Sequence, residues 1–226
     1  MRKILSVLVL IILCSCNKVT ETENEINSVQ AVLNFYNGEC LKSKGFEKNN
    51  EVDKQYYEIE ISKSELLNQS PDKLKSHSAN IAYLFYSNLK SEKSNYDEIK
   101  VKINLSNGES QSFKYADKEL NEIEKLLPKI NEIIEYIKTD NYGSLTKQFE
   151  DSIKVEEKTI TELFTSLQSK YGKINKTQFQ GFQFEDSKNF GKLIIIREAL
   201  VFEKITASMN LIFNRETKKL ISVEFP

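Results

Sequence analysis

Apolar residues spaced three or four positions apart predict helices in four parts of the chain. The predicted helices cover about residues 25–37, 71–89, 118–139 and 160–171. Their ends carry the expected signals, since Pro71 suits a first helical turn and Gly172 suits the position after a last one. Shorter helices are expected at about 65–67 and 144–149.

The third predicted helix carries apolar residues at alternating steps of three and four. This spacing is typical of a coiled-coil seam, but it lasts under three heptads, so we interpret it as the core-facing stripe of a domain helix. Pro128 lies within the stripe, and a proline inside a helix removes a hydrogen bond and costs about 3 kcal/mol. We therefore expect a bend, with 118–127 packed on an N-terminal unit and 128–139 in a C-terminal one. Leu126 and Leu127 would then be buried between the units.

Strands are indicated where apolar and polar residues alternate along the chain. One strand is predicted near 56–61 and a hairpin over 99–115. A later series covers 173–184, 193–202, 205–213 and 220–225. Short loops join the members of this series, so we expect a four-stranded antiparallel meander. Its second strand is apolar on both faces at residues 193–196, which favours a central position.

The loop of the predicted hairpin sets its register. A two-residue turn at Asn107-Gly108 would place Phe113 opposite Lys102, on the wrong face. A three-residue loop with Gly108 in the left-handed conformation instead pairs Phe113 with Val101, so that the apolar residues share one face. We therefore predict the three-residue loop.

The longest apolar run lies at the start of the chain, where Arg2 and Lys3 precede about ten apolar residues. This run is too short to span a membrane, and its layout is typical of a secretory signal. The sequence LCSC at 13–16 resembles the lipobox of bacterial lipoproteins. The resemblance implies removal of residues 1–15 and acylation of Cys16, whose acyl chains would anchor the protein to a membrane.

The residues after Cys16 bear on where the anchored protein resides. Residues 16–25 are polar and are predicted to form a flexible tether. The resemblance to lipoproteins implies the cell envelope of a Gram-negative bacterium. Asn17, in place of the aspartate that favours inner-membrane retention, favours the outer membrane.

The remaining chain divides into a small α+β unit at 26–117 and a second unit at 118–226. The second unit contains the sequences DNYGSLTKQF, LFTSLQSKYGKI and TKKLISVEFP, in which helices precede the four strands. In this order it resembles small secreted domains of unknown function, related to the cystatin-like and nuclear-transport-factor-like cone. The resemblance implies an α+β fold in which helices pack on a curved four-stranded antiparallel sheet.

Composition removes several classes of function. The 32 basic and 33 acidic residues are nearly balanced and form no like-charged run, so a nucleic-acid partner is not expected. Cys40 is the only thiol that remains beside Cys16 in the processed chain, which leaves no pair for an intramolecular disulfide. We interpret Cys40 as a small buried hydrophobe, with a reactive thiol as the alternative. Glycine-rich phosphate loops are absent from the sequence, and no cofactor is expected.

Few residues are candidates for chemistry. His77 is the only histidine, which excludes a multi-histidine zinc site, and its polar neighbours favour a surface or capping role. No catalytic residue and no metal ligand is predicted. Glu198 shares a strand face with Ile194 and Ile196 and is expected to point into the concave side of the sheet, where burial would raise its pKa. Phe182 and Phe184 are the aromatic candidates for lining a pocket there.

These observations favour a membrane-anchored envelope lipoprotein that acts as a non-enzymatic module binding an envelope protein or a small apolar ligand. Two alternatives stay open. One is a small hydrolase or isomerase that uses carboxylates inside the cone. The other is an inhibitor or self-protection protein that binds one secreted partner.

Overall fold

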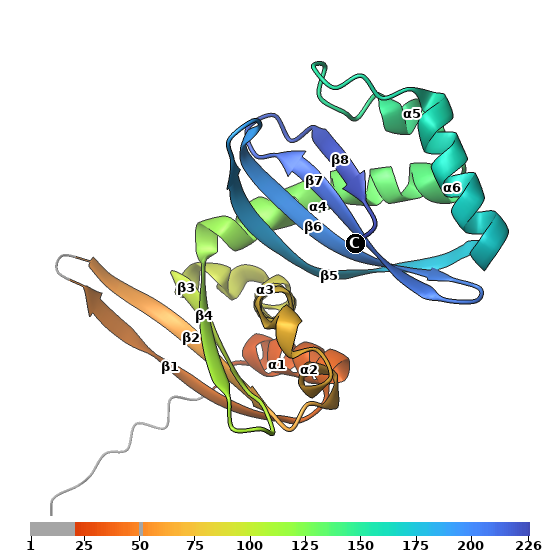
Figure 1. Cartoon of the computed structure of the whole chain (residues 1–226). Helices are drawn as coiled ribbons and strands as arrows, with labels where there is room; N and C mark the ends of the chain where they lie inside the picture. Colours follow the sequence, from red (N-terminus) through yellow and green to blue (C-terminus); the bar gives the residue numbers. More distant parts are fainter. Residues whose placement is uncertain (1–20, 50–51) are drawn as a thin grey trace, which may run out of the picture.

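The computed structural model describes residues 21–49 and 52–226, which form two four-stranded sheets with helices packed against them (Figure 1). The predicted signal sequence and Cys16 lie outside the described residues. In chain order the elements are α1 (Glu23–Tyr36), β1 (Glu39–Asn49), β2 (Val52–Ser62), α2 (Glu65–Asn68), η1 (Pro71–Lys73), α3 (Leu74–Asn88), η2 (Lys90–Asn95), β3 (Glu98–Asn104), β4 (Ser110–Ala116), α4 (Asp117–Lys138), α5 (Tyr142–Thr146), α6 (Glu157–Tyr171), β5 (Ile174–Ser187), β6 (Gly191–Phe202), β7 (Thr206–Asn214) and β8 (Leu220–Glu224).

The N-terminal sheet has the strand order β1-β2-β3-β4, with β2 and β3 parallel and the outer pairs antiparallel. Helices α1 and α3 pack against each other and cover one face of this sheet (Figure 1). Alternate residues of β2 and β3, such as Ile59 and Val101, are fully buried beneath them. The predicted hairpin register is confirmed, because Val101 pairs with Phe113 and Gly108 has a φ of +91°.

The C-terminal sheet is the predicted antiparallel meander β5-β6-β7-β8. Helix α4 runs along one face of it, and α5 and α6 lie across one end (Figure 1). The buried stripe of α4 faces the sheet, as expected for a core helix, and includes Leu120, Ile123, Ile130 and Ile137. The α+β class and the helices packed on a four-stranded antiparallel sheet are therefore confirmed.

The predicted division at Pro128, with a second helix beginning there, is wrong, because α4 is one helix from Asp117 to Lys138. Pro128 lies on the exposed side of α4. Because proline has no N–H, the Glu124 carbonyl oxygen loses its helical hydrogen bond, and on this side of the helix water can bind it instead. The apolar stripe continues on both sides of it, with Leu126 and Ile130 buried, and this burial offsets the local cost of the proline. Leu127, expected to be buried, is only partly so.

The first half of α4 contacts both units. Tyr86 of α3 donates a hydrogen bond to the Asp117 carboxylate at 2.9 Å, and Lys93 of η2 pairs with Glu124. On the C-terminal side Arg215 donates to Glu122, with 2.7 Å between Nη2 and Oε2. Residues 118–127 therefore do not belong to the N-terminal unit alone.

The predicted tether over 16–25 ends earlier than expected, because α1 begins at Glu23. Thr22 and Glu25 form a capping box in which each side chain accepts a hydrogen bond from the other residue's backbone N–H. Glu25 is 1% exposed, and its carboxylate accepts hydrogen bonds from Lys44 at 2.7 and 2.8 Å and from the Tyr96 hydroxyl. A buried, paired carboxylate thus fixes the start of α1 to the sheet.

Strand β1 has no counterpart among the predicted elements. It is an edge strand whose largest apolar side chains, Leu41 and Phe46, are exposed, so no alternation marks it in the sequence. Cys40 lies in this strand with its side chain partly buried against the core. Burial raises the pKa of the Cys40 thiol to about 11, which keeps it protonated at neutral pH.

Candidate functional site

The two units meet where the start of α3 packs on β5. Gly181 in β5 has a φ of +124°, and a Cβ at this position would lie 2.4 Å from the Ser76 carbonyl oxygen. The pairing of β5 with β6 shifts between Phe179 and Gly181, and the Ser76 hydroxyl donates a hydrogen bond to the Gln180 carbonyl oxygen at 3.3 Å. The resulting bulge presents bare backbone to α3, and only glycine permits so close an approach.

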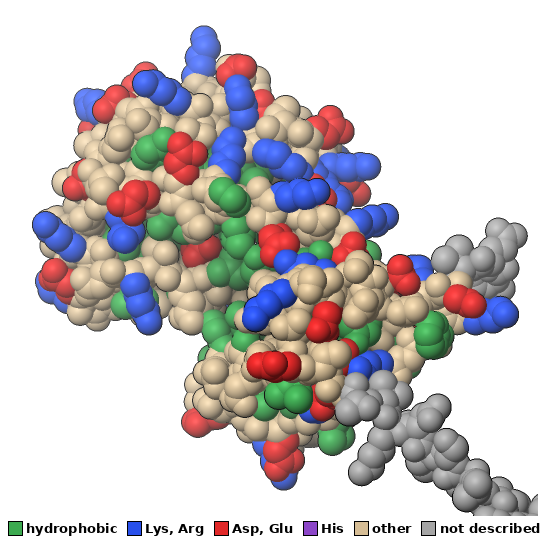
Figure 2. All heavy atoms as spheres, turned by 180° about the vertical axis from the view of Figure 1, so that it is seen from behind, with side chains coloured by type: hydrophobic (Ala, Val, Ile, Leu, Met, Phe, Trp, Pro, Cys, Tyr) green, Lys and Arg blue, Asp and Glu red, His purple; other side chains and the backbone are tan. Residues whose placement is uncertain are grey.

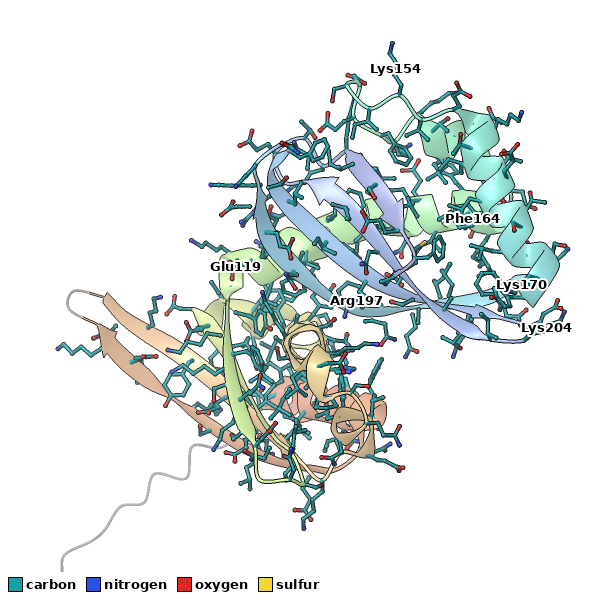
Figure 3. All side chains as sticks on the ribbon, viewed as in Figure 1. Glu119, Lys154, Phe164, Lys170, Arg197 and Lys204 are labelled. Atoms are coloured by element: carbon teal, nitrogen blue, oxygen red, sulfur yellow. The ribbon has the colours of Figure 1, made fainter. Side chains whose placement is uncertain are left out.

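A groove opens beside this contact, between the start of α3 and the C-terminal sheet. One end is a hollow of about 250 Å³ lined by Leu66, Ser70, Lys73, Ser76, His77, Gln180, Arg197, Ala199, Thr206, Ala207 and Ser208. A neighbouring hollow of about 470 Å³ is lined by Ala31, Asn34, Phe35, Leu66, Gln178 and Gln180. Since the two share Leu66 and Gln180, we call them together the inter-unit groove. Figure 3 shows Arg197 on the side of the C-terminal sheet that faces the N-terminal unit.

His77 forms a buried part of the groove wall. It is 7% exposed, so the predicted surface position is wrong; its helix turns this face toward the other unit. Its Nδ1 atom lies 3.3 Å from the Tyr36 hydroxyl oxygen, which also accepts a hydrogen bond from Asn80 at 2.9 Å. Its Nε2 atom is buried and has no hydrogen-bond partner among the residues that the structure describes.

The charge state of His77 follows from this environment. Burial is the main cause that lowers its pKa to about 4, and the positive charges of Lys73 and Arg197 lower it further, against the opposite effect of Asp72. The imidazole is therefore neutral at neutral pH. The unpaired nitrogen of this neutral, buried ring is a vacant hydrogen-bonding position in the wall of the groove.

The polar side chains around His77 are mostly hydrogen-bond donors without partners. Within residues 21–49 and 52–226, Lys73 forms no ion pair, and neither does Arg197, whose Nε atom contacts Asn210 Oδ1 at 3.5 Å. The Ser70, Thr206 and Ser208 hydroxyls likewise bond to none of the described residues. No carboxylate lines the groove.

A second hollow, of about 480 Å³, lies over the first half of α4. It is lined by Asp117, Lys118, Asn121, Glu122, Lys125, Leu126, Lys129 and Lys218. Figure 2 shows lysine and arginine side chains gathered on this side of the C-terminal unit. Glu122 pairs here with Lys218 and Arg215, and Lys125 and Lys118 are solvent-exposed. Because none of its buried polar atoms lacks a partner in the described chain, this surface is the weaker candidate.

Glu198, the carboxylate singled out in the sequence, points toward the buried face of the C-terminal sheet. It is 3% exposed, with Phe179 and Met209 opposite it on the neighbouring strands. It forms no hydrogen bond or ion pair with another described residue, and burial alone raises its pKa to about 8. Arg197, its neighbour in sequence, points to the other face of β6 and lines the groove.

The two aromatic pocket candidates also pack in the core. Phe182 is 4% exposed, and its ring lies 5.6 Å from that of Phe184 and 5.7 Å from that of Tyr115. Arg215 covers the ring of Phe184, with its guanidinium carbon 4.0 Å from the ring centroid. Neither phenylalanine lines the inter-unit groove.

The residues that line the groove were not predicted as a site. They come from positions as far apart as Lys73 and Ser208, and no local spacing connects them. The one available signal was strand parity, which places Arg197 and Ala199 together on the face opposite Glu198. Among the described residues, no group of three or more His, Cys, Asp or Glu side chains could hold a metal ion, and no helix is long and apolar enough to cross a membrane.

Comparison with known proteins adds little to this geometry. No family model matches the sequence, and no curated protein matches it either. Among solved structures, the chain is similar to Bd1075 of Bdellovibrio bacteriovorus, with 13% sequence identity and a TM-score of 0.33. The match covers 78% of this chain and 62% of that one. A similarity this low carries no argument about fold or function.

Proposed function

We propose that the protein is a lipid-anchored envelope protein that binds a ligand, without converting it, in the inter-unit groove. The observation that carries the proposal is the set of polar groups without partners in the groove wall, namely His77, whose buried Nε2 atom has no partner from the described chain, and the cations Lys73 and Arg197. A buried polar atom without a hydrogen bond costs about 1–3 kcal/mol. A ligand that supplies the missing partner would recover this free energy on binding.

The lining of the groove favours binding over catalysis. A general base needs an imidazole whose pKa is near the working pH, whereas the pKa of His77 is about 4. Its Nδ1 atom lies against the Tyr36 hydroxyl, where a catalytic triad would have a carboxylate. The alternative function, a hydrolase or isomerase that uses Glu198, would need a second titratable group beside that carboxyl. None of the described residues forms a hydrogen bond or an ion pair with Glu198.

The envelope location rests on the sequence. The LCSC motif at 13–16 and the apolar run before it are the grounds for acylation at Cys16. A groove formed between two units of an anchored protein is suited to holding a ligand at the membrane surface.

A tryptophan that fills the groove tests the proposal. The protein would be isolated from membranes in mild detergent and weighed by native mass spectrometry, together with Ser208→Trp and Ser222→Trp. Both serines are half-buried on strands of the same sheet, but only Ser208 lines the groove. We expect a non-covalent mass on the wild type and on Ser222→Trp that is lost from Ser208→Trp. The absence of any bound mass, or its retention by Ser208→Trp, would refute the proposal.

A further inference from the structure

We propose that the ligand of the inter-unit groove presents an oxyanion, a carboxylate or a phosphate, to Lys73, His77 and Arg197. This inference rests on the proposed function and specifies the class of ligand.

Lys73 and Arg197 have no acidic partner among the described residues, in contrast to Arg215, the other described arginine. Arg215 is paired with Glu122 at 2.7 Å, and Lys100 with Glu47 at 2.6 Å. Lys73 and Arg197 line one hollow and are paired with no carboxylate of the described chain. Two uncompensated positive charges in one partly enclosed hollow create a positive potential that attracts an anion.

The hydrogen-bonding groups around the cations are matched to the same ligand. The Arg197 guanidinium is oriented through its Nε atom by Asn210, which leaves its two Nη groups available. Arginine binds carboxylate and phosphate oxygens through paired N–H groups. The hydroxyls of Ser70 and Ser208 add two further donors, and neither bonds to another described residue.

His77 completes the donor set in one of its two neutral tautomers. The Tyr36 hydroxyl has one proton and two acceptors within reach, the His77 carbonyl oxygen at 3.2 Å and Nδ1 at 3.3 Å. In the tautomer in which it donates to Nδ1, the proton of the ring resides on Nε2, and the resulting N–H in the groove wall has no acceptor from the described chain. An oxyanion supplies that acceptor and selects this tautomer. A cationic or purely apolar ligand would leave the N–H unsatisfied, and a cationic one would also be repelled by Lys73 and Arg197.

Binding of an anion is expected to be coupled to proton uptake. The charged groups that act on His77 are Lys73 and Asp72 beside it and Arg197 from β6. A bound anion offsets the two cations and raises the pKa of His77 above its value in the free protein. By linkage, the affinity for the anion should rise as the pH falls below the pKa of the bound state, and level off below the pKa of the free state.

The single histidine makes this measurable without ambiguity. Untagged protein carrying ¹⁵N-labelled histidine would be titrated separately with sodium phosphate and sodium acetate, with sodium chloride at matched ionic strength as the control. We expect phosphate or acetate to move the His77 nitrogen signals saturably and to raise its apparent pKa, and chloride to do neither. The ion that binds more tightly assigns the group as a phosphate or a carboxylate.

Matched lysine and arginine variants locate the effect. Arg197→Gln and Lys73→Gln should each weaken anion binding about tenfold, because each removes one charge-assisted hydrogen bond. Arg197→Lys keeps the charge and should retain part of the affinity. Lys75→Gln removes an exposed lysine of α3 that does not line the groove, and should bind as the wild type does.

Two results would overturn the inference. One is a response to chloride equal to that to phosphate and acetate; the other is equal loss in Lys75→Gln and Arg197→Gln. If no anion moves the His77 signals while Ser208→Trp still removes the mass bound to the isolated protein, the groove binds a neutral ligand. In that case the proposed function stands and the oxyanion assignment fails.

Discussion

Replacement of Glu198 by glutamine tests how a carboxyl without partners is accommodated in the core. The carboxyl has an ordinary pKa of 4.5 in the unfolded chain and about 8 in the folded protein, and burial is the cause. Between these two values the unfolded chain is ionised while the folded protein must keep the proton. The stability of the wild type should therefore be complete below about pH 4.5 and fall as the pH rises toward 8.

The magnitude follows from the interval between the unfolded pKa and the working pH. One pH unit within this interval corresponds to about 1.4 kcal/mol, so Glu198 lowers the free energy of unfolding at pH 7 by about 3 kcal/mol. Glu198→Gln has no proton to retain and should be more stable than the wild type by about this amount at pH 7. At pH 4.5 and below, where the carboxyl is protonated in both states, the difference should nearly vanish.

Urea unfolding followed by far-UV circular dichroism at several pH values from 4 to 8 measures this difference, since the chain has no tryptophan for fluorescence. Glu216→Gln, which changes an exposed carboxyl in the turn between β7 and β8, is the matched control and should follow the wild type. The reasoning fails if Glu198→Gln and the wild type have parallel pH profiles, or if the glutamine variant is the less stable at pH 8.

Three further perturbations test other parts of the structure. Gly181→Ala should lower the free energy of unfolding by about 2 kcal/mol or more, because φ is positive at this position and the new Cβ meets the Ser76 carbonyl oxygen. Gly108→Ala is the control, since Gly108 also has a positive φ but lies in open space, and it should lower the free energy of unfolding by less. Equal losses of stability in urea unfolding would contradict the clash. Pro128→Ala should raise stability by about 1–3 kcal/mol, since it restores an amide to the interior of α4; an unchanged urea midpoint would show that the helix bears no such cost. Cys16→Ala should abolish acylation and release the protein from membranes, and fractionation with membranes as for the wild type would exclude lipid as the anchor.

The predictable parts of this fold are those in which a local pattern and the tertiary structure agree. The hairpin register could be predicted because loop length and strand parity together leave one pairing for Phe113 and Val101. The division of the helix at Pro128 was predicted from a local rule, which the burial of Leu126 and Ile130 on both sides of the proline overrides. Strand β1 gave no pattern because Leu41 and Phe46 face solvent at a sheet edge.

The inter-unit groove could not be predicted from local sequence patterns, for a different physical reason. Strand parity correctly placed Glu198 on the buried face of β6 and favoured a pocket on that side. The same parity places Arg197 on the outer face, which becomes a site only because His77 and Lys73 of the other unit lie over it. Contacts between units have no period in the sequence, so they are found only in the folded molecule.

If Cys16 is acylated, the early start of α1 limits how far the protein can lie from the membrane. Six residues separate Cys16 from Glu23, the first residue of the helix. Even fully extended, this leash spans about 25 Å. With Cys16 acylated, as proposed, the N-terminal unit would be held against the lipid headgroups, because the buried Glu25 ties the start of α1 to its sheet. Ala31 and Asn34 lie on this same helix and line the groove, so the binding site would be presented close to the bilayer surface.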